Sequence, residues 1–367
     1  MPQKTATLQA VASSLGLSKT TVSVALRGRP GVSESMRSKI LAEALRLGYT
    51  PNPVAAELMA MVRSRRHSNT GETIAFINTF QQDPSLMRRI SSFSLFLKGA
   101  TEHAAHFGYR IEEFRAHDYS RGLARLDQVL KARGIRGVLV GPRWFDESEI
   151  ALDWSAYSSV LMGETTYGAG IYRVCNHHPQ STELALTSMA RLGYKRIGLE
   201  LMTNYEHVRH FDFLSGVAPA ERTVGQTARF FVRVQPRRAV PGLESVPPEK
   251  RDEFSRQHDN LHILPKLAKW IRRERLDALV SLHGYDIDLL RSIKTESGQA
   301  LGYARLDAPH DSGCAGVNQH PHDVGSTAMD LLRGLLHAGE RGGVPRPRIV
   351  LVEGEWMDGP TAPRIRT

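Results

Sequence analysis

Residues 7–26 read TLQAVASSLGLSKTTVSVAL, and this stretch decides the fold of the amino-terminal part of the chain. Gly16 separates two short segments in which apolar residues recur with the period of an α-helix. Thr7 and Ser18 stand where these helices would begin, and such side chains accept the unpaired amides of a first helical turn. The stretch therefore predicts two helices joined by a tight turn. The apolar face of the first helix would hold Leu8, Val11, Ala12 and Leu15.

The second of these helices has two unlike faces. Val22, Ala25 and Leu26 fall on one face and would be buried. A helix fits the major groove of DNA, where its first residues reach base edges while its dipole and free amides favour phosphate. Lys19 and Thr20 are therefore placed to contact bases. The residues placed for contacts with the DNA backbone are Ser18, Thr21, Ser23 and Arg27.

A third helix is expected to close this unit. Ser33 can cap it after the turn at residues 28–31, and Gly48 supplies a stop at its end. Two short helices joined by a tight turn, with a third completing the core, make a helix-turn-helix. A plain three-helix bundle whose polar face is only solvated has the same spacing and remains the alternative. The positions expected to be buried in the third helix are Ile40, Leu41, Ala44 and Leu45.

Positive charge is concentrated at this end of the chain. The 367 residues carry a net charge of +10, and residues 1–66 hold ten Lys and Arg against three Glu. A small basic unit joined to a near-neutral body is typical of a nucleic-acid-binding module attached to another domain. Two cysteines without metal-type spacing favour a reducing compartment, and the sequence leads us to expect neither a secretory leader nor a membrane span.

Four motifs of this region resemble the DNA-binding head of lactose-repressor/galactose-repressor (LacI/GalR) regulators. They are TLQAVA at 7–12, GLSKTTVS at 16–23, GVS at 31–33 and LGYTPN at 47–52, and they follow one register without a gap. The resemblance implies a transcriptional repressor that binds a palindromic double-stranded DNA operator as a homodimer, in the cytoplasm and associated with the nucleoid. It adds Thr7 and Ser33 to the expected DNA contacts.

One position departs from the family pattern. Members usually carry an arginine directly after the Val-Ser of the second helix, where it often reads a guanine, and this chain has Val24. Valine donates no hydrogen bond, but it can contact the methyl group of thymine. We therefore expect an operator that differs from the usual family half-site at this position.

Residues 51–60, PNPVAAELMA, resemble the hinge helix of the same family. Pro53 suits the first helical position, and so short a helix is marginal alone, so it would form when two copies pack together on DNA. By resemblance, Leu58 would wedge into the minor groove and kink the duplex. A plain linker is the alternative. The expected hinge contacts are Asn52, Val54, Ala55 and Leu58.

From residue 73 onward, short apolar runs alternate with helix-length segments. This pattern predicts right-handed βαβ units and parallel sheets, and there are too many strands for one compact sheet. The Pro- and charge-rich stretch 235–260 reads as a long surface loop. The strand candidates are residues 73–80, 109–114, 136–141, 160–163, 196–201, 229–234, 277–282 and 300–303.

The expected fold is an all-α helix-turn-helix head followed by an α/β core of two lobes. The head would span residues 1–50, the hinge and linker 51–71, and the core 72–367. The first lobe would take about 72–172 and 321–340, and the second about 173–319 and 341–367. Motifs at 95–100, 192–198 and 315–320 are similar to the periplasmic-binding-protein-like core of the LacI/GalR family, which implies dimerisation through this part of the chain.

The same resemblance implies that a small, sugar-like effector binds in the cleft between the lobes. Ligands of such folds lie at the carboxyl ends of the strands, so polar residues that follow a strand are candidate contacts. A helix cap is the alternative role for each of them. The candidates are Asn78, Gln81, Asp83, Trp144, Glu164, Asn204, Tyr205, Arg209, His283 and Asp286.

The usual sugar-binding residues of the family are missing or moved. Arg209 is the nearest arginine to the helix where the family places one, and residues 302–305 read GYAR where an aspartate is common. A core that has lost effector control and serves only for dimerisation is therefore an alternative.

Other classes of protein fit less well. A transport-type sugar-binding protein would lack the basic head. An enzyme fused to a helix-turn-helix would need a phosphate loop or a catalytic motif, and the sequence contains none. The histidine pairs at 177–178 and at 320 and 322 have no matched third ligand. We therefore expect no catalytic residues, cofactor or metal.

Overall fold

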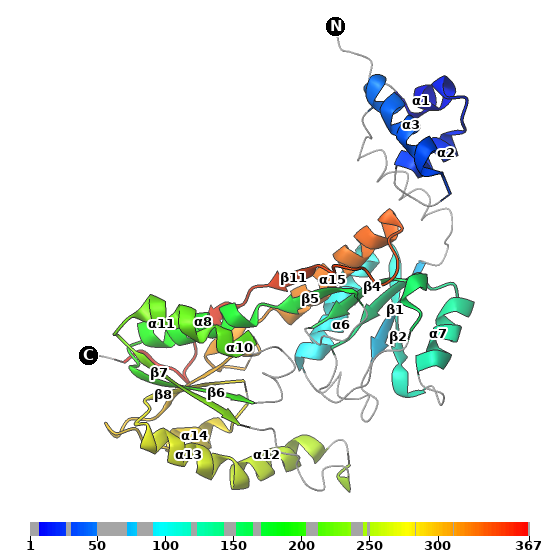
Figure 1. Cartoon of the computed structure of the whole chain (residues 1–367). Helices are drawn as coiled ribbons and strands as arrows, with labels where there is room; N and C mark the ends of the chain where they lie inside the picture. The colour runs from blue at the N-terminus through cyan, green and yellow to red at the C-terminus, as the bar shows by residue number, and fades with distance from the viewer. Residues whose placement is uncertain are drawn as a thin grey trace. The chain divides into compact units, whose positions relative to one another are not determined.

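The computed structural model describes residues 7–26, 31–49, 72–78, 91–118, 123–142, 152–163, 170–202, 212–235, 245–247, 250–282, 284–310 and 312–365 (Figure 1). The chain divides into two compact units, Met1–Glu72 and Thr73–Thr367. The division falls one residue from the expected start of the core. The hinge and linker expected at residues 51–71 lie outside the described residues.

The first unit contains the three expected helices, α1 (Leu8–Ser14), α2 (Lys19–Leu26) and α3 (Glu34–Arg46). The turn between α1 and α2 passes through Gly16, whose φ of 63° is a left-handed conformation that glycine adopts without strain. The helices enclose a small apolar core to which each contributes two fully buried residues: Val11, Ala12, Val22, Ala25, Ile40 and Ala44.

The prediction for α3 was half wrong. Ile40 and Ala44 are buried, but Leu41 is 50% exposed and Leu45 is 84% exposed. Successive residues of a helix are rotated by about 100°, so each of these leucines stands a third of a turn away from its buried neighbour. The narrow face set by Ile40 and Ala44 is all that α1 and α2 can cover, because both are short.

The second unit begins with a six-stranded sheet in the order β11-β5-β4-β3-β1-β2. Four pairs, β1–β3, β3–β4, β4–β5 and β5–β11, are parallel. Its strands are β1 (Glu72–Asn78), β2 (Tyr109–Arg115), β3 (Gly137–Val140), β4 (Ser158–Met162), β5 (Tyr172–Asn176) and β11 (Ile349–Val352).

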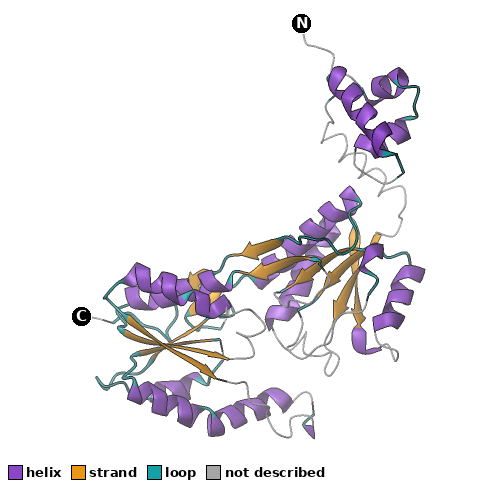
Figure 2. Ribbon diagram, in the orientation of Figure 1, coloured by secondary structure: helices purple, strands orange, loops and turns teal. Residues whose placement is uncertain are grey.

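Helices cover both faces of this first sheet (Figure 2). On one face, α6 (Ser91–His106) and α15 (Pro321–Ala338) bury residues such as Phe96 and Leu332 against the strands. On the other face, α7 (Leu123–Ala132) buries Leu126 and Leu130. Because both faces are covered, the central strands read as continuous apolar runs rather than alternating ones. Short 3-10 turns lie at Ala116–Asp118 and Trp154–Ala156.

The crossing of α6 and α15 explains two glycines of the core motifs. A Cβ atom on Gly99 would lie 2.0 Å from the backbone oxygen of His322, and one on Gly325 would lie 2.0 Å from that of Phe96. No side chain fits at either position, so the two backbones can approach closely. Residues from both ends of the core, far apart in sequence, are thereby packed into one lobe.

The second sheet has the order β12-β10-β9-β8-β6-β7 and is parallel except for the antiparallel pair β10–β12. On one of its faces lie α8 (His178–Arg191), α10 (Asp212–Ser215) and α11 (Val217–Val224), and on the other lie α13 (Leu264–Arg273) and α14 (Ile287–Ser292) (Figure 1). Its strands are β6 (Arg196–Met202), β7 (Arg229–Gln235), β8 (Ala278–Ser281), β9 (Gly302–Arg305), β10 (Gly316–Asn318) and β12 (Glu355–Met357).

The lobe boundaries differ from those expected. The whole of β5 and β11 belongs to the first sheet, so the chain passes into the second lobe after Asn176 and again after Val352, not at 172/173 and 340/341. Hydrogen bonds join the chain segments that connect the two lobes. Asn176 Nδ2 donates to Gln319 O at 2.5 Å, and His177 N donates to Val352 O at 2.8 Å. Strands of three to five residues carry too little periodicity to reveal which sheet they join.

Part of the expected loop at 235–260 is helical. Helix α12 (Arg251–His262) precedes α13, and β7 ends at Gln235. Both cysteines, Cys175 and Cys314, are buried and form no disulfide. Among the described residues, no helix combines the length and the apolar character that crossing a bilayer requires.

Candidate DNA-binding surface and effector region

The start of α2 is fixed by Ser18, as the sequence predicts. Its Oγ accepts the amide of Thr21 at 3.0 Å and lies 2.8 Å from Thr21 Oγ1. Val22 and Ala25 are buried on the other side of the helix, at 0% and 2% exposure, and this sets the rotation of α2 about its axis. The local sequence thus determines both where the helix begins and which face it turns to solvent.

The face of α2 that remains outside carries the predicted base contacts. Lys19 and Thr20 are exposed, and Ser23 and Val24 are half-buried. A lysine and a threonine at the free amino end of a helix offer donors and acceptors where the helix dipole also favours phosphate. With Thr21, the structure therefore brings five of the sequence-predicted residues together on one helix. Arg27 lies outside the described residues.

Thr7 and Ser33 act as helix caps. Thr7 Oγ1 accepts the amide of Ala10 at 3.2 Å, and Ser33 Oγ accepts that of Met36 at 3.4 Å. Both side chains are exposed, and each stands at a helix amino terminus, where free amides bind phosphate oxygens. Their capping role does not conflict with the predicted DNA contact.

Two acids of the head are neutralised within α3. Glu43 accepts hydrogen bonds from Arg46 Nε at 2.7 Å and Nη2 at 2.6 Å, and these bonds, with a further one from Ser14, lower the pKa of Glu43 to about 2. Glu34 lies 3.9 Å from Arg37 Nε. The described part of the head therefore presents little uncompensated negative charge to a polyanion.

The predicted hinge contacts Asn52, Val54, Ala55 and Leu58 lie outside the described residues, and so do most of the candidate effector contacts: Gln81, Asp83, Trp144, Glu164, Asn204, Tyr205, Arg209 and His283. Asn78 and Asp286 are described. Asn78 ends β1, is fully buried, and donates from Nδ2 to Glu113 Oε1 at 2.8 Å. Asp286 caps α14, because its Oδ1 accepts the amides of residues 288 and 289 at 3.0 and 3.1 Å.

A buried polar cluster missed by the sequence analysis lies at the carboxyl end of the second sheet. Glu200 on β6 is only 2% exposed. It accepts hydrogen bonds from Gln235 Nε2 at 2.8 Å and from the hydroxyl of Tyr285, and Arg233 Nε lies 3.9 Å away. We call these four residues the Glu200 cluster. Burial and the neighbouring carboxylate raise the pKa of Tyr285 well above its ordinary value, so the hydroxyl stays protonated as a donor.

A sequence signal for this cluster existed. Glu200 interrupts the apolar strand RIGLELM at 196–202, and a buried carboxylate must be hydrogen-bonded to be stable. Its partners could not be inferred, because Gln235 and Tyr285 belong to other strands and loops, 35 and 85 residues away.

A second charged pair stands at the end of β9. Arg305 donates from Nε and Nη2 to Asp307 Oδ1, at 3.1 and 2.8 Å, and Asp307 raises the pKa of the arginine. A Cβ atom on Gly284 would lie 3.0 Å from Arg305 Nη1, so the loop after β8 passes directly against the guanidinium. Arg305 therefore occupies the strand end at which the LacI/GalR resemblance led us to look for an aspartate.

Comparison with known proteins agrees with this architecture. A family model described as "Bacterial regulatory proteins, lacI family" matches residues 7–52. The "NTD biosynthesis operon regulator NtdR" of Bacillus subtilis (strain 168) is 25% identical over 204 residues, which are 55% of this chain and 57% of that protein. The chain thus matches little more than half the length of this curated relative.

Solved structures share the fold over nearly the whole chain. The structure titled "transcriptional regulator CelR-cellobiose complex" has a TM-score of 0.54 at 17% identity and covers 96% of this chain and 98% of its own. The lac repressor dimer bound to operator and the anti-inducer ONPF has a TM-score of 0.54 at 18% identity, with 98% and 100% covered. Residues 7–52 thus match the lacI family of bacterial regulatory proteins, and the core of two parallel-stranded lobes shares the fold of the solved lac repressor.

Proposed function

We propose that this regulator represses transcription by binding a two-fold symmetric operator as a homodimer, with α2 of each head in the major groove. The observation that carries the proposal is the exposure of Lys19 and Thr20 at the start of a helix whose rotation is fixed by buried Val22 and Ala25. Protein symmetry would be mirrored in the DNA, because each head reads one half-site.

The proposal is tested by comparing two lysines of the same head. Lys19 is exposed on α2, and Lys39 is exposed on α3 and is the matched control, since it carries the same charge. Lys19→Ala should lower affinity for the operator by about tenfold or more and relax base preference in the half-site, as expected for loss of a base contact worth about 1–3 kcal/mol. Lys39→Ala should change binding to specific and nonspecific duplexes equally. Equal effects of both variants on base preference would contradict the placement of α2.

Salt dependence provides an independent check. A protein that contacts about 6–10 phosphates loses about 10³–10⁵ in affinity between 50 and 200 mM salt. We expect a response of this size from the dimer. A flat response would be inconsistent with a basic head that neutralises DNA phosphates.

The hinge proposal rests on the sequence alone. Leu58 would enter the minor groove, so Leu58→Ala should weaken specific binding and reduce DNA bending, while phosphate-driven nonspecific binding stays nearly the same. Leu58→Met preserves the volume and should restore affinity if the leucine only packs the hinge. Equal bend angles for wild type and Leu58→Ala in bend-sensitive gel shifts would rule out the wedge.

We further propose that a small, sugar-like effector binds between the lobes at the carboxyl ends of the strands. Asp286 supports this role, because its side chain is exposed and both capping bonds use Oδ1, so that Oδ2 accepts no hydrogen bond from the described residues. The remaining candidates are Asn78, Asp83, Trp144, Glu164, Asn204, Tyr205, Arg209 and His283.

The second candidate is a core that has lost effector control. Residues 302–305 read GYAR where the resemblance suggests an aspartate, and the Glu200 carboxylate is already occupied by residues of its own lobe. A thermal-shift screen separates the two. A ligand at a hundred times its Kd stabilises the folded protein by about 2.7 kcal/mol, and a true effector should also change operator affinity. Operator binding by a dimer that no sugar stabilises would favour the second candidate.

A further inference from the structure

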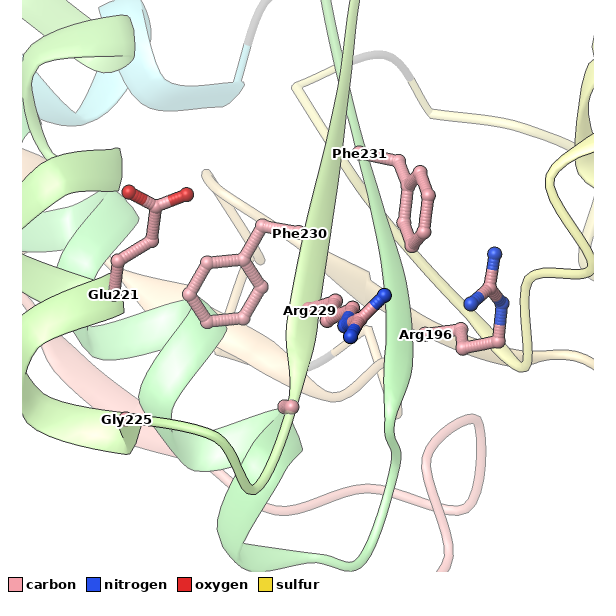
Figure 3. A pocket seen from close by; sticks show the side chains of 7 residues that line it. Arg196, Glu221, Gly225, Arg229, Phe230 and Phe231 are labelled. Carbon is pink, nitrogen blue, oxygen red and sulfur yellow. The ribbon is translucent and has the colours of Figure 1, made fainter.

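A pocket of about 410 Å³ opens at the amino ends of β6 and β7, the end of the second sheet opposite the Glu200 cluster. This volume is within the range of small-molecule sites, about 300–1,000 Å³. Figure 3 shows Arg196, Arg229 and Phe231 on one side of β7, and Phe230 with Glu221 on the other. The lining residues are Arg196, Glu221, Gly225, Ala228, Arg229, Phe230 and Phe231.

Two positive charges stand side by side in this pocket. Arg196 and Arg229 are the first residues of β6 and β7 and are register partners in the parallel pair. Neighbouring strands are about 4.8 Å apart, so both side chains leave the same face of the sheet from adjacent points. Like charges placed directly opposite each other on a sheet are destabilising.

Arg196 is held in a fixed position. Its Nε and Nη2 donate to the backbone oxygen of Glu274 at 2.9 and 2.7 Å, at the carboxyl end of α13. Its guanidinium carbon lies 4.5 Å from the centre of the Phe231 ring. A guanidinium ordered in this way loses little further freedom when it binds a ligand.

Two acids near the arginines are engaged elsewhere, and the third, Glu221, stands on the other side of β7 (Figure 3). Asp277 Oδ2 and Oδ1 accept the backbone amides of Lys195 and Arg196, at 2.8 and 2.9 Å. The Glu274 carboxylate accepts from Arg273 Nε at 2.8 Å. Within the described parts of the chain, the side chain of Arg229 makes no hydrogen bond or ion pair. Its charge is therefore uncompensated by a described neighbour and faces the open pocket.

We propose that this pocket binds a small organic anion, a carboxylate or a phosphate ester, between the guanidinium groups of Arg196 and Arg229. Arginine matches the geometry of both anions with paired N–H donors, and such charge-assisted bonds are about twice as strong as neutral ones. The apolar part of the ligand would lie along the ring of Phe231, which stands on the same side of β7 as the two arginines (Figure 3). This site is separate from the effector region, which lies at the other end of the same strands.

The test uses phenyl phosphate and benzoate as probes, titrated into the full-length protein by calorimetry. We expect saturable one-to-one binding of at least one probe. The probe that binds more tightly indicates whether the pocket recognises a phosphate ester or a carboxylate. Arg229→Gln should weaken this binding by about tenfold or more, the loss of a charge-assisted contact. The matched control is Arg191→Gln, an exposed arginine on α8 of the same lobe, and it should bind as wild type does.

The unliganded Arg229→Gln variant provides a second test. Removing one of two adjacent like charges should leave the unfolding temperature of the second unit unchanged or raised, whereas loss of a structural contact would lower it. The proposal is wrong if neither probe binds saturably below 10 mM, or if Arg229→Gln binds as tightly as wild type. A lowered unfolding temperature in the unliganded variant would assign Arg229 a structural role instead.

Discussion

Polar side chains are positioned differently in the head and at the carboxyl ends of the strands in the second sheet. In the head, a core of six small and medium apolar residues holds α2 so that Lys19 and Thr20 stay exposed. In the second lobe, Glu200 is itself buried and is held by side chains from β7 and from the loop after β8. A surface that reads a polyanion needs only correct rotation of a helix, whereas a buried polar cluster depends on every partner being present.

The comparison predicts the largest effect in the core of the head. Ile40→Asp places an unpaired charge in the apolar core and should destabilise the head by more than about 3 kcal/mol, which abolishes specific DNA binding. Its neighbour provides the control, since Leu41 is 50% exposed and Ile40 is 0% exposed. Leu41→Asp should change stability by no more than about 0.5 kcal/mol.

Gel shifts together with thermal unfolding of the full chain measure both variants. The unfolding transition of residues 73–367 should be the same in each, because these residues form a compact unit of their own. Equal loss of DNA binding in Ile40→Asp and Leu41→Asp would mean that the exposed leucines of α3 are covered when the protein functions.

The second effect concerns the Glu200 cluster. Glu200→Ala removes the acceptor of two hydrogen bonds, one from the amide of half-buried Gln235 and one from the hydroxyl of buried Tyr285. Unpaired buried groups cost about 1–3 kcal/mol each, so the second unit should lose about 3 kcal/mol of unfolding free energy. Glu296→Ala is the matched control, because its side chain is 67% exposed and lies 3.6 Å from Arg275. An exposed pair of this kind contributes about 0–1 kcal/mol, and denaturant unfolding separates the two cases.

The smallest effect is a pH dependence in the head. Bonds from Arg46 lower the pKa of Glu43 from 4.5 to about 2. A carboxyl whose pKa is lowered in the folded state contributes stability that is fully present above its unfolded pKa and is lost as the pH falls through the folded one. The unfolding temperature of the head should therefore decline between about pH 5 and pH 2. Glu43→Gln should reduce this decline. If the unfolding temperature of the variant declined with falling pH as much as that of wild type, the Glu43–Arg46 pair would not be the cause.

The same contrast explains what could be predicted from the sequence. The three helices, their caps at Thr7, Ser18 and Ser33, and the eight strand candidates of the core follow from local spacing and were predicted correctly. The strands β5, β10, β11 and β12 were not among the candidates. The exposure of Leu41 and Leu45 was not predicted, because the width of the buried face of α3 depends on the helices that pack against it. The lobe assignment of β11 and the partners of Glu200 depend on pairing between residues far apart in the chain.

The central claim is that α2 reads a symmetric operator, and selection from random duplexes by wild type and Val24→Arg tests it most directly. Val24 is half-buried on α2 and donates no hydrogen bond, whereas arginine pairs with guanine, a difference of about 1–3 kcal/mol. We expect a two-fold repeat for wild type and, for Val24→Arg, a change towards guanine at one symmetric position of each half-site. An unchanged consensus in the variant, or enrichment without two-fold symmetry, would contradict it.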